Sequence, residues 1–311
     1  MNQKICPVCG SARIRENLND VRDYITGTLF TVMHCGDCEL DFTSPQPENM
    51  EAYYPPKYRR YNKWVVMILT SMYRFQVGKW RKLYKESGTA LEMGCGDGLM
   101  LKTLQQYGWK VVGTERTQEM ADEVAKNYGF PVYVGGLEKI PSGKKFDLII
   151  LFQVLEHLGD PLGVLRQCAD FLGEKGMLVI AVPNFGSWQA RFSLARWFHL
   201  DVPRHLFHFS PTSLDNALTL AGLQINSISF ISFEHDPYGW VQSSLNKYLG
   251  NKNRLTRYLM HLERLTLASI ADLMLSLLLI GPAVALSVVS WIFGRGAIMQ
   301  VVSSRKDRHN V

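Results

Sequence analysis

The stretch Thr-Ala-Leu-Glu-Met-Gly-Cys-Gly-Asp-Gly, residues 89–98, constrains the fold more than any other part of the chain. A short apolar strand ends in Glu92, and glycine then occupies every second position, at Gly94, Gly96 and Gly98. These glycines permit a tight turn and leave no Cβ between the main chain and a ligand above the end of the strand. The motif therefore predicts an α/β protein with a ligand site at the carboxyl end of this strand.

A second acidic residue indicates what kind of ligand this is. The next apolar strand, 110–115, ends in Glu115. From this position a carboxylate can accept hydrogen bonds from both hydroxyls of a ribose. A nicotinamide-binding fold would have Gly-x-Gly-x-x-Gly, but Leu99 occupies the place of the third glycine. The segment from Glu92 to Gly98 instead resembles the glycine-rich loop of class I S-adenosylmethionine-dependent methyltransferases. The alternative is a glycine turn in some other α/β protein.

The order of predicted elements downstream fits this resemblance. Two near-continuous apolar runs, 146–152 and 176–183, are typical of strands buried on both faces of a parallel sheet. The resemblance implies an α/β, Rossmann-like sheet of seven strands, whose last strand lies antiparallel beside the fifth. The expected strands are 89–95, 110–115, 132–135, 146–152, 176–183, 223–233 and 297–304, and the expected helices are 98–107, 117–128, 160–172 and 211–221.

The resemblance also implies S-adenosylmethionine as the cofactor and identifies the residues that would bind it. The residues so implied are Glu92, Gly94, Cys95 and Gly96 for its methionine part, Glu115 for the ribose, Gly136 and Leu137 for the adenine, and Gln153 for closing the pocket on the methionine side.

Candidate bases follow two of the predicted strands. Methyl transfer is an in-line displacement, in which the protein aligns the acceptor and, where needed, removes a proton. His157 lies just after the strand 146–152, and His205 and His208 follow the strand 176–183. Catalytic side chains gather at this edge of open α/β sheets, whereas a lone histidine is more often structural. We interpret these three histidines as candidate catalytic residues, and the adjacent Glu156 as an anchor of local structure.

Four cysteines form two Cys-x-x-Cys pairs near the amino terminus. In a reducing compartment, paired knuckles of this kind are typical of a tetrahedral zinc site with a structural role. The alternatives are a redox pair or incidental cysteines. The predicted zinc ligands are Cys6, Cys9, Cys35 and Cys38, with a hairpin expected between the knuckles, over 24–33.

Residues 273–293 contain no charged side chain and are long enough to span a membrane. A single crossing conflicts with a last strand that must return to the same sheet. Gly281 and Pro282 near the middle can break a helix. We therefore expect a hydrophobic helical hairpin that dips into the membrane, with basic residues on both sides facing anionic head groups. The alternative is a hairpin buried in a dimer interface.

These observations predict four parts of the chain and its location. The 311 residues are 47% hydrophobic and 20% charged, as in a folded protein, and no basic run with interleaved aromatics points to nucleic acid. The amino terminus lacks the apolar core of a signal peptide, so we expect a cytoplasmic protein at the inner face of the cytoplasmic membrane. The predicted parts are a zinc ribbon (1–45), a linker and cap helix (46–88), a methyltransferase core (89–233 with 297–306) and a helical insertion (234–296).

The ribbon and the segment 203–209 also resemble a bacterial methyltransferase branch of sugar and surface-polysaccharide pathways. This resemblance implies transfer of a methyl group to a hydroxyl of a sugar or lipid-linked glycan. One alternative is methylation of a lipophilic small molecule such as a quinone precursor. Another is a non-catalytic, cofactor-binding scaffold. The sequence leaves open the acceptor, the methylated atom and whether the protein is an oligomer.

Overall fold

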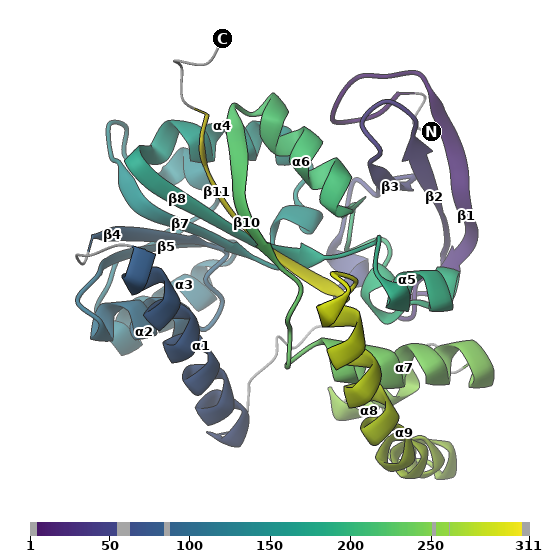
Figure 1. The fold of residues 1–311 in the computed structure, drawn as a ribbon. Helices are drawn as coiled ribbons and strands as arrows, with labels where there is room; N and C mark the ends of the chain where they lie inside the picture. Colours follow the sequence, from purple (N-terminus) through teal and green to yellow (C-terminus); the bar gives the residue numbers. More distant parts are fainter. Residues whose placement is uncertain (1–4, 55–62, 84–87, 251–252, 261, 307–311) are drawn as a thin grey trace.

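The structure is a computed structural model that describes residues 5–54, 63–83, 88–250, 253–260 and 262–306. A twisted central sheet lies between two layers of helices, with a smaller sheet and a group of helices at one end (Figure 1). Of the predicted linker and cap helix, residues 55–62 and 84–87 lie outside the described part of the chain.

The central sheet has seven strands in the order β10-β11-β8-β7-β4-β5-β6. β11 runs antiparallel to both of its neighbours, whereas the pairs from β8 to β6 are parallel. The predicted seven-stranded fold with a reversed last strand is therefore confirmed. The strands are β4 (Thr89–Met93), β5 (Lys110–Glu115), β6 (Val132–Val134), β7 (Phe146–Phe152), β8 (Leu172–Pro183), β10 (Leu223–Ser229) and β11 (Ile298–Arg305).

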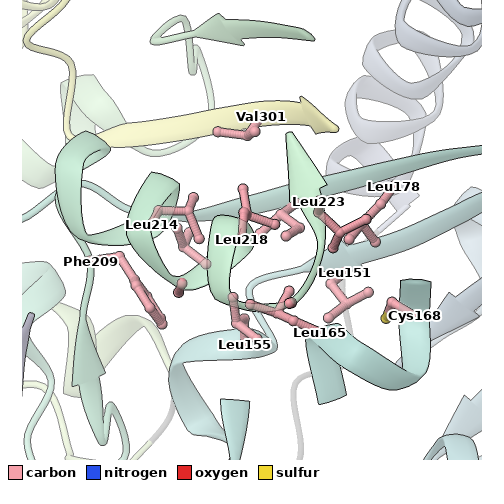
Figure 2. Packing of buried hydrophobic residues seen from close by; sticks show 14 of the residues in the cluster. Leu151, Leu155, Leu165, Cys168, Leu178, Phe209, Leu214, Leu218, Leu223 and Val301 are labelled. Atoms are coloured by element: carbon pink, nitrogen blue, oxygen red, sulfur yellow. The ribbon is translucent and has the colours of Figure 1, made fainter. Parts of the chain in front are cut away.

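Strand β7 explains why both faces of the sheet are covered. Its side chains alternate, so that Leu148 and Ile150 face one layer of helices and Ile149 and Leu151 face the other. The first layer contains α1 (Lys63–Leu83), α2 (Leu99–Gln106) and α3 (Gln118–Tyr128), and the second contains α4 (Pro161–Phe171) and α6 (Pro211–Leu220). Figure 2 shows the second layer, where side chains of α4 and α6 meet those of the sheet.

Local sequence signals set the helix ends in this core. Thr117 caps α3 by accepting a hydrogen bond from the backbone N–H of Met120, and Gly129 ends the helix at a φ of 75°. Ser210 and Ser213 form a capping box at α6, with Pro211 in the first turn. These ends fall close to those expected from the sequence.

The amino-terminal cysteine-containing region, which we call the ribbon (residues 5–44), is built into the core. Its strands are β1 (Ile14–Arg22), β2 (Leu29–Cys35) and β3 (Asp41–Ser44), and β3 pairs with β9 (Phe207–His208). The hairpin predicted over 24–33 is displaced, because β1 precedes this range and the turn lies at 23–28. The four-stranded sheet β1-β2-β3-β9 thus includes a strand from the predicted core, and the boundary at residue 45 does not separate the ribbon from it.

The insertion before the last strand contains α7 (Asp236–Leu249), α8 (Arg254–Leu259) and α9 (Leu267–Ile292). The predicted hairpin is wrong, because α9 runs through Pro282 as a single helix. A proline inside a helix removes one backbone hydrogen bond and costs about 3 kcal/mol. The other bonds of α9 and its packing against α7 and α8 outweigh this cost.

Helix α9 is the reverse of an ordinary surface helix, because its polar side chains face the protein and its apolar side chains face outward. Its buried residues are mostly small or polar: Ser269, Asp272, Ala283, Ser287 and Ser290. Its exposed side chains are large and apolar, and Leu277 and Leu278 are 69% and 74% exposed. Within the described residues, α9 is the one helix long and apolar enough to cross a membrane.

Candidate active site

The glycine-rich loop between β4 and α2 has the conformation that its glycines require. Gly94, Gly96 and Gly98 have φ values of 67°, 53° and 73°, a region that other residues seldom occupy. A Cβ on Gly94 would lie 2.8 Å from Val154, whereas a Cβ on Gly96 would meet nothing within 4 Å. The space above Gly96 is therefore open, as a ligand site above the strand would need.

The two predicted acidic residues lie beside this loop. One oxygen of Glu115 accepts a hydrogen bond from the N–H of Gly96 (3.0 Å), and the other accepts from that of Arg116 (2.8 Å). Glu92 is 5% exposed, and its Oε2 has no partner among the described residues. Burial raises the pKa of Glu92 well above its usual value. An unpaired buried carboxylate oxygen needs a partner, and the ammonium of S-adenosylmethionine would suit it.

The other residues predicted to bind the cofactor lie at the same edge of the sheet. Their side chains differ in burial and in the groups that they contact. Cys95 points into the core toward Gly113, and burial raises the pKa of its thiol. Leu137 is buried in the core, so its main chain rather than its side chain is available to an adenine. The carboxylate of Glu138 accepts a hydrogen bond from the N–H of Gly136 (3.0 Å). Gln153 has a φ of 54°, a strained value that often marks functional sites.

His157 and His205 lie together although 48 positions separate them in the sequence. Their ring centroids are 4.7 Å apart, with the rings inclined at 70°. Nδ1 of His157 lies 2.8 Å from the carbonyl of Arg204, and Nδ1 of His205 lies 2.8 Å from that of His199. A carbonyl only accepts, so both Nδ1 atoms donate and each Nε2 carries a free lone pair. Burial lowers the pKa of His157 to about 3 and also lowers that of His205, so both rings are neutral at physiological pH.

Glu156 lies beside these two histidines. From the sequence we had interpreted it as an anchor of local structure. Its side chain is 1% exposed, and neither carboxylate oxygen has a partner among the described residues. Burial raises the pKa of Glu156 to about 8. One ligand atom each from Glu156, His157 and His205 lies within 4.8 Å of the other two, a grouping that could hold a metal ion. The sequence signal was the Glu-His pair directly after a buried strand.

His208 points away from this pair and toward the ribbon. Oγ1 of Thr43 donates to the carbonyl of His205 (2.7 Å) and lies 3.0 Å from Nε2 of His208. Because the hydroxyl has a single proton, Nε2 of His208 must donate to it. Burial lowers the pKa of His208 to about 3. His208 therefore differs from the other two histidines, since its Nε2 is already engaged.

Arg204 joins the ribbon to the segment that carries the histidines. Its guanidinium donates to Asp23 of the ribbon (2.8 Å), to Asp201 (2.8 and 3.0 Å) and to the carbonyl of Tyr53 (2.6 Å). It also lies over the ring of Tyr24, at 4.3 Å from the centroid. Sequence reasoning missed Asp23 and Thr43, because nothing in their local sequence indicates a contact with residues beyond 200.

The four predicted zinc ligands converge in the ribbon. Their sulfur atoms all lie within 4.8 Å of one another, with Sγ separations of 3.6 Å for Cys6–Cys38 and 3.5 Å for Cys9–Cys35. Tetrahedral zinc with bonds of about 2.3 Å would hold sulfur atoms about 3.8 Å apart. The hydrogen bond between Cys6 and Cys38 lowers the pKa of Cys6 and raises that of Cys38, as two close sulfur atoms that share one proton would do. The arrangement fits a structural Cys₄ zinc site, whose occupancy stays a prediction.

Comparisons with known proteins agree with this architecture. A sequence family described as "Methyltransferase domain" matches residues 76–228. The ubiquinone biosynthesis O-methyltransferase of Rhizobium etli is 26% identical over 155 residues, which cover 46% of this chain and 62% of that protein. The protein of the same name from Xanthomonas axonopodis is 25% identical over 169 residues, 49% of this chain and 70% of that protein. This chain thus spans less than two thirds of the Rhizobium protein.

Solved structures with related folds have low sequence identity. A possible histamine N-methyltransferase from Thermotoga maritima is 18% identical with a TM-score of 0.46, covering 78% of this chain and 93% of that one. Magnesium protoporphyrin IX methyltransferase from Synechocystis, solved with bound S-adenosylhomocysteine, is 17% identical with a TM-score of 0.44, covering 57% and 84%. The match to the sequence family and the strand order of the central sheet together identify residues 76–228 as a class I S-adenosylmethionine-dependent methyltransferase domain.

Proposed function

We propose that this protein transfers a methyl group from S-adenosylmethionine to a hydroxyl of a lipophilic small molecule, such as a quinone precursor, at a membrane surface. The observation that carries the proposal is the outward apolar face of α9. Contiguous apolar patches larger than a few hundred Å² are rare on soluble monomers. A helix that buries serine and aspartate while exposing leucine and valine is suited to contact with lipid.

The arrangement of α9 favours a helix that lies in the membrane surface over one that crosses the bilayer. α9 packs against α7 and α8, and its buried Asp272 binds Arg254 of α8 through two hydrogen bonds (2.7 and 2.9 Å). A crossing helix would carry these polar partners into the hydrocarbon. The exposed Lys247 and Arg264, on the segments beside α9, would meet anionic head groups.

The roles of the site residues follow from this proposal. The cofactor supplies a methyl group that is already activated on a sulfonium. Glu92, Gly96 and Glu115 would bind it at the carboxyl end of β4 and β5. The neutral rings of His157 and His205 would orient the acceptor hydroxyl and take its proton. The names of the Rhizobium and Xanthomonas relatives favour oxygen as the methylated atom and a quinone precursor as the acceptor.

The sequence had led us to expect a sugar or lipid-linked glycan as the acceptor. The comparisons give this acceptor no support and favour the lipophilic small molecule that was its alternative. The glycan remains a second candidate only because of the Cys₄ ribbon, the feature on which that resemblance rested. A lipid-linked glycan would reach the enzyme at the same membrane surface, so a direct assay must separate the two.

The test measures transfer of labelled methyl groups to a panel of acceptors in phospholipid vesicles. The panel contains a polyprenylated catechol, the same catechol without its prenyl tail, and a lipid-linked saccharide. We expect methylation of the prenylated catechol, weaker methylation of the tailless form, and none of the saccharide. The opposite preference would favour the glycan, and no transfer to any acceptor would support a non-catalytic scaffold.

The membrane part of the proposal has a separate test. The double variant Leu277→Glu/Leu278→Glu places two charges on the outward face of α9 without touching its buried face. We expect this variant to stop floating with vesicles that contain anionic lipids, while it stays folded and binds the cofactor. The matched control is Leu220→Glu, which alters an exposed leucine of α6, 47% exposed, in the methyltransferase domain. Equal flotation of both variants, or no flotation of the unaltered protein, would contradict the membrane contact.

A further inference from the structure

The cluster of Glu156, His157 and His205 offers one carboxylate and two imidazoles to a common point, within 4.8 Å of one another. Both carboxyl oxygens of Glu156 are buried without a partner among the described residues, although a buried polar group nearly always has one. One of these oxygens lies within 4.8 Å of a ring nitrogen of each histidine.

The hydrogen bonds around the histidines prepare both rings to bind a metal ion. Histidine ligands of metal ions usually donate the other ring N–H to a carbonyl or a carboxylate, which fixes the ring and its tautomer. Nδ1 of His157 donates to the carbonyl of Arg204, and Nδ1 of His205 donates to that of His199. The backbone N–H of Leu206 also donates to the carbonyl of Glu156 (2.8 Å), which ties the two segments together.

We propose that Glu156, His157 and His205 bind a divalent transition-metal ion, separate from the zinc predicted for the ribbon. A site with two imidazoles and one carboxylate suits ions such as Zn²⁺, Fe²⁺ or Co²⁺ and leaves coordination positions open. A cation would replace the proton of Glu156, so that one carboxylate charge and two imidazole nitrogens would hold it. The nearby guanidinium of Arg204 is compensated by Asp201 and Asp23.

The site gives the metal ion a role in the reaction, and this part of the inference rests on the proposed function. Glu156 and His157 follow β7 closely after Gln153, which the sequence assigns to the cofactor pocket. With the ion bound, the histidine lone pairs hold the metal and no longer act as bases. The ion would instead lower the pKa of an acceptor hydroxyl that joins an open coordination position, and the proton would leave to solvent. The acceptor oxygen then forms the bond to the methyl carbon while the carbon–sulfur bond breaks and leaves its electron pair on sulfur. A catechol could bind through both of its oxygens.

The test titrates Co²⁺ into full-length protein that already holds one Zn²⁺ per chain, and follows binding by calorimetry and visible absorption. We expect one Co²⁺ per chain with absorption bands of nitrogen and oxygen ligands and without thiolate charge-transfer bands. Glu156→Gln and His205→Ala should each weaken this binding at least roughly tenfold, while the exposed-acid control Glu174→Gln should not. Unaltered cofactor affinity in the variants shows that they are folded.

Three outcomes would overturn the site: no Co²⁺ binding beyond the zinc of the ribbon, binding that Glu156→Gln leaves unchanged, or thiolate bands that place the ion on the cysteines. Because this titration contains no acceptor, its failure is distinct from that of the proposed function. If Co²⁺ binds as expected but no hydroxyl acceptor is methylated, the metal site stands and the acceptor assignment falls.

Discussion

Thr43 and His208 lie 165 positions apart in the sequence, and their side chains meet at 3.0 Å between strands β3 and β9. The same threonine hydroxyl donates to the carbonyl of His205, and its backbone N–H donates to the carbonyl of Leu206 (2.9 Å). Through Thr43, the ribbon thus packs directly against the segment that carries the candidate catalytic histidines. A metal ion bound by the cysteines would make the ribbon more rigid, and the ribbon would in turn hold this segment in place.

Removing the Thr43 hydroxyl should therefore affect turnover more than cofactor binding. We expect Thr43→Val, which keeps the shape of the side chain, to lower kcat by roughly tenfold, because small displacements of reacting groups are costly. The Kd for S-adenosylmethionine should be nearly unchanged, and Thr43→Ser should restore activity. A variant that loses cofactor affinity and turnover together would indicate general destabilisation instead.

Gly96 gives a test of the cofactor site. A valine there would fill the open space above the turn and would also have to adopt a φ of 53°. We expect Gly96→Val to abolish S-adenosylmethionine binding measured by calorimetry. Gly143→Val is the matched control, because Gly143 also has a positive φ (80°) and open surroundings but lies in the loop before β7. Unchanged affinity in Gly96→Val would remove the cofactor assignment.

The ribbon should contain one zinc ion per chain, which elemental analysis of freshly purified, reduced protein can count. Cys38→Ser should lose the metal and lower the melting temperature, whereas Cys168→Ser, which alters a lone buried cysteine of α4, should keep it. Loss of zinc should reduce turnover more than cofactor binding, because the glycine-rich loop belongs to the central sheet and not to the sheet of the ribbon. Reduced protein without zinc would refute this site.

The two adjacent histidines should matter for turnover and not for cofactor affinity. A positioned histidine contributes typically about 10²–10⁴-fold to a proton transfer. We expect His157→Ala and His205→Ala each to lower kcat by at least roughly tenfold, while the Kd for S-adenosylmethionine stays nearly constant. His235→Ala, in the insertion, serves as the control. Full activity in both site variants would leave catalysis to alignment of the two substrates alone.

Asp236 should make stability depend on pH. Burial raises its pKa from 3.8 to about 7. Between these values the folded protein keeps a proton that the unfolded chain has lost, so the free energy of unfolding falls as pH rises from about 4 to about 7. Asp236→Asn should remove this contribution, so its stability relative to the unaltered protein should increase over that range. If the difference in free energy of unfolding between Asp236→Asn and the unaltered protein stayed the same at every pH, the assignment would be contradicted.

The parts of the fold that could be predicted are those that local patterns encode. The apolar runs 146–152 and 176–183 predicted strands because period and length suffice to identify buried strands, and Thr117 and Gly129 are local helix-end signals. The pairing of β3 with β9 and the ion pair of Arg204 with Asp23 join distant segments. Such contacts depend on tertiary packing, which a single sequence does not reveal.

The error at Gly281 and Pro282 has a similar origin. The sequence shows a helix-breaking pair, but not the neighbouring helices whose packing stabilises a continuous helix through it. The return of the chain to the sheet was predicted correctly; the hairpin inferred from it was unnecessary. A helix that lies along the surface of the molecule also begins and ends on the same side of the membrane.

One buried carboxylate controls how the molecule would move on a membrane. Asp236, at the start of α7, accepts hydrogen bonds from the indole of Trp291 near the end of α9 (2.6 Å) and from the backbone of Ala297 (3.0 Å). Only residues 293–297 separate α9 from the sheet strand β11. Asp236 consequently joins the end of the apolar helix to the residue that precedes β11. An enzyme anchored through α9 would hold its active site at a constant height and tilt above the lipid, and would reach only those acceptors whose reactive hydroxyl projects to that depth.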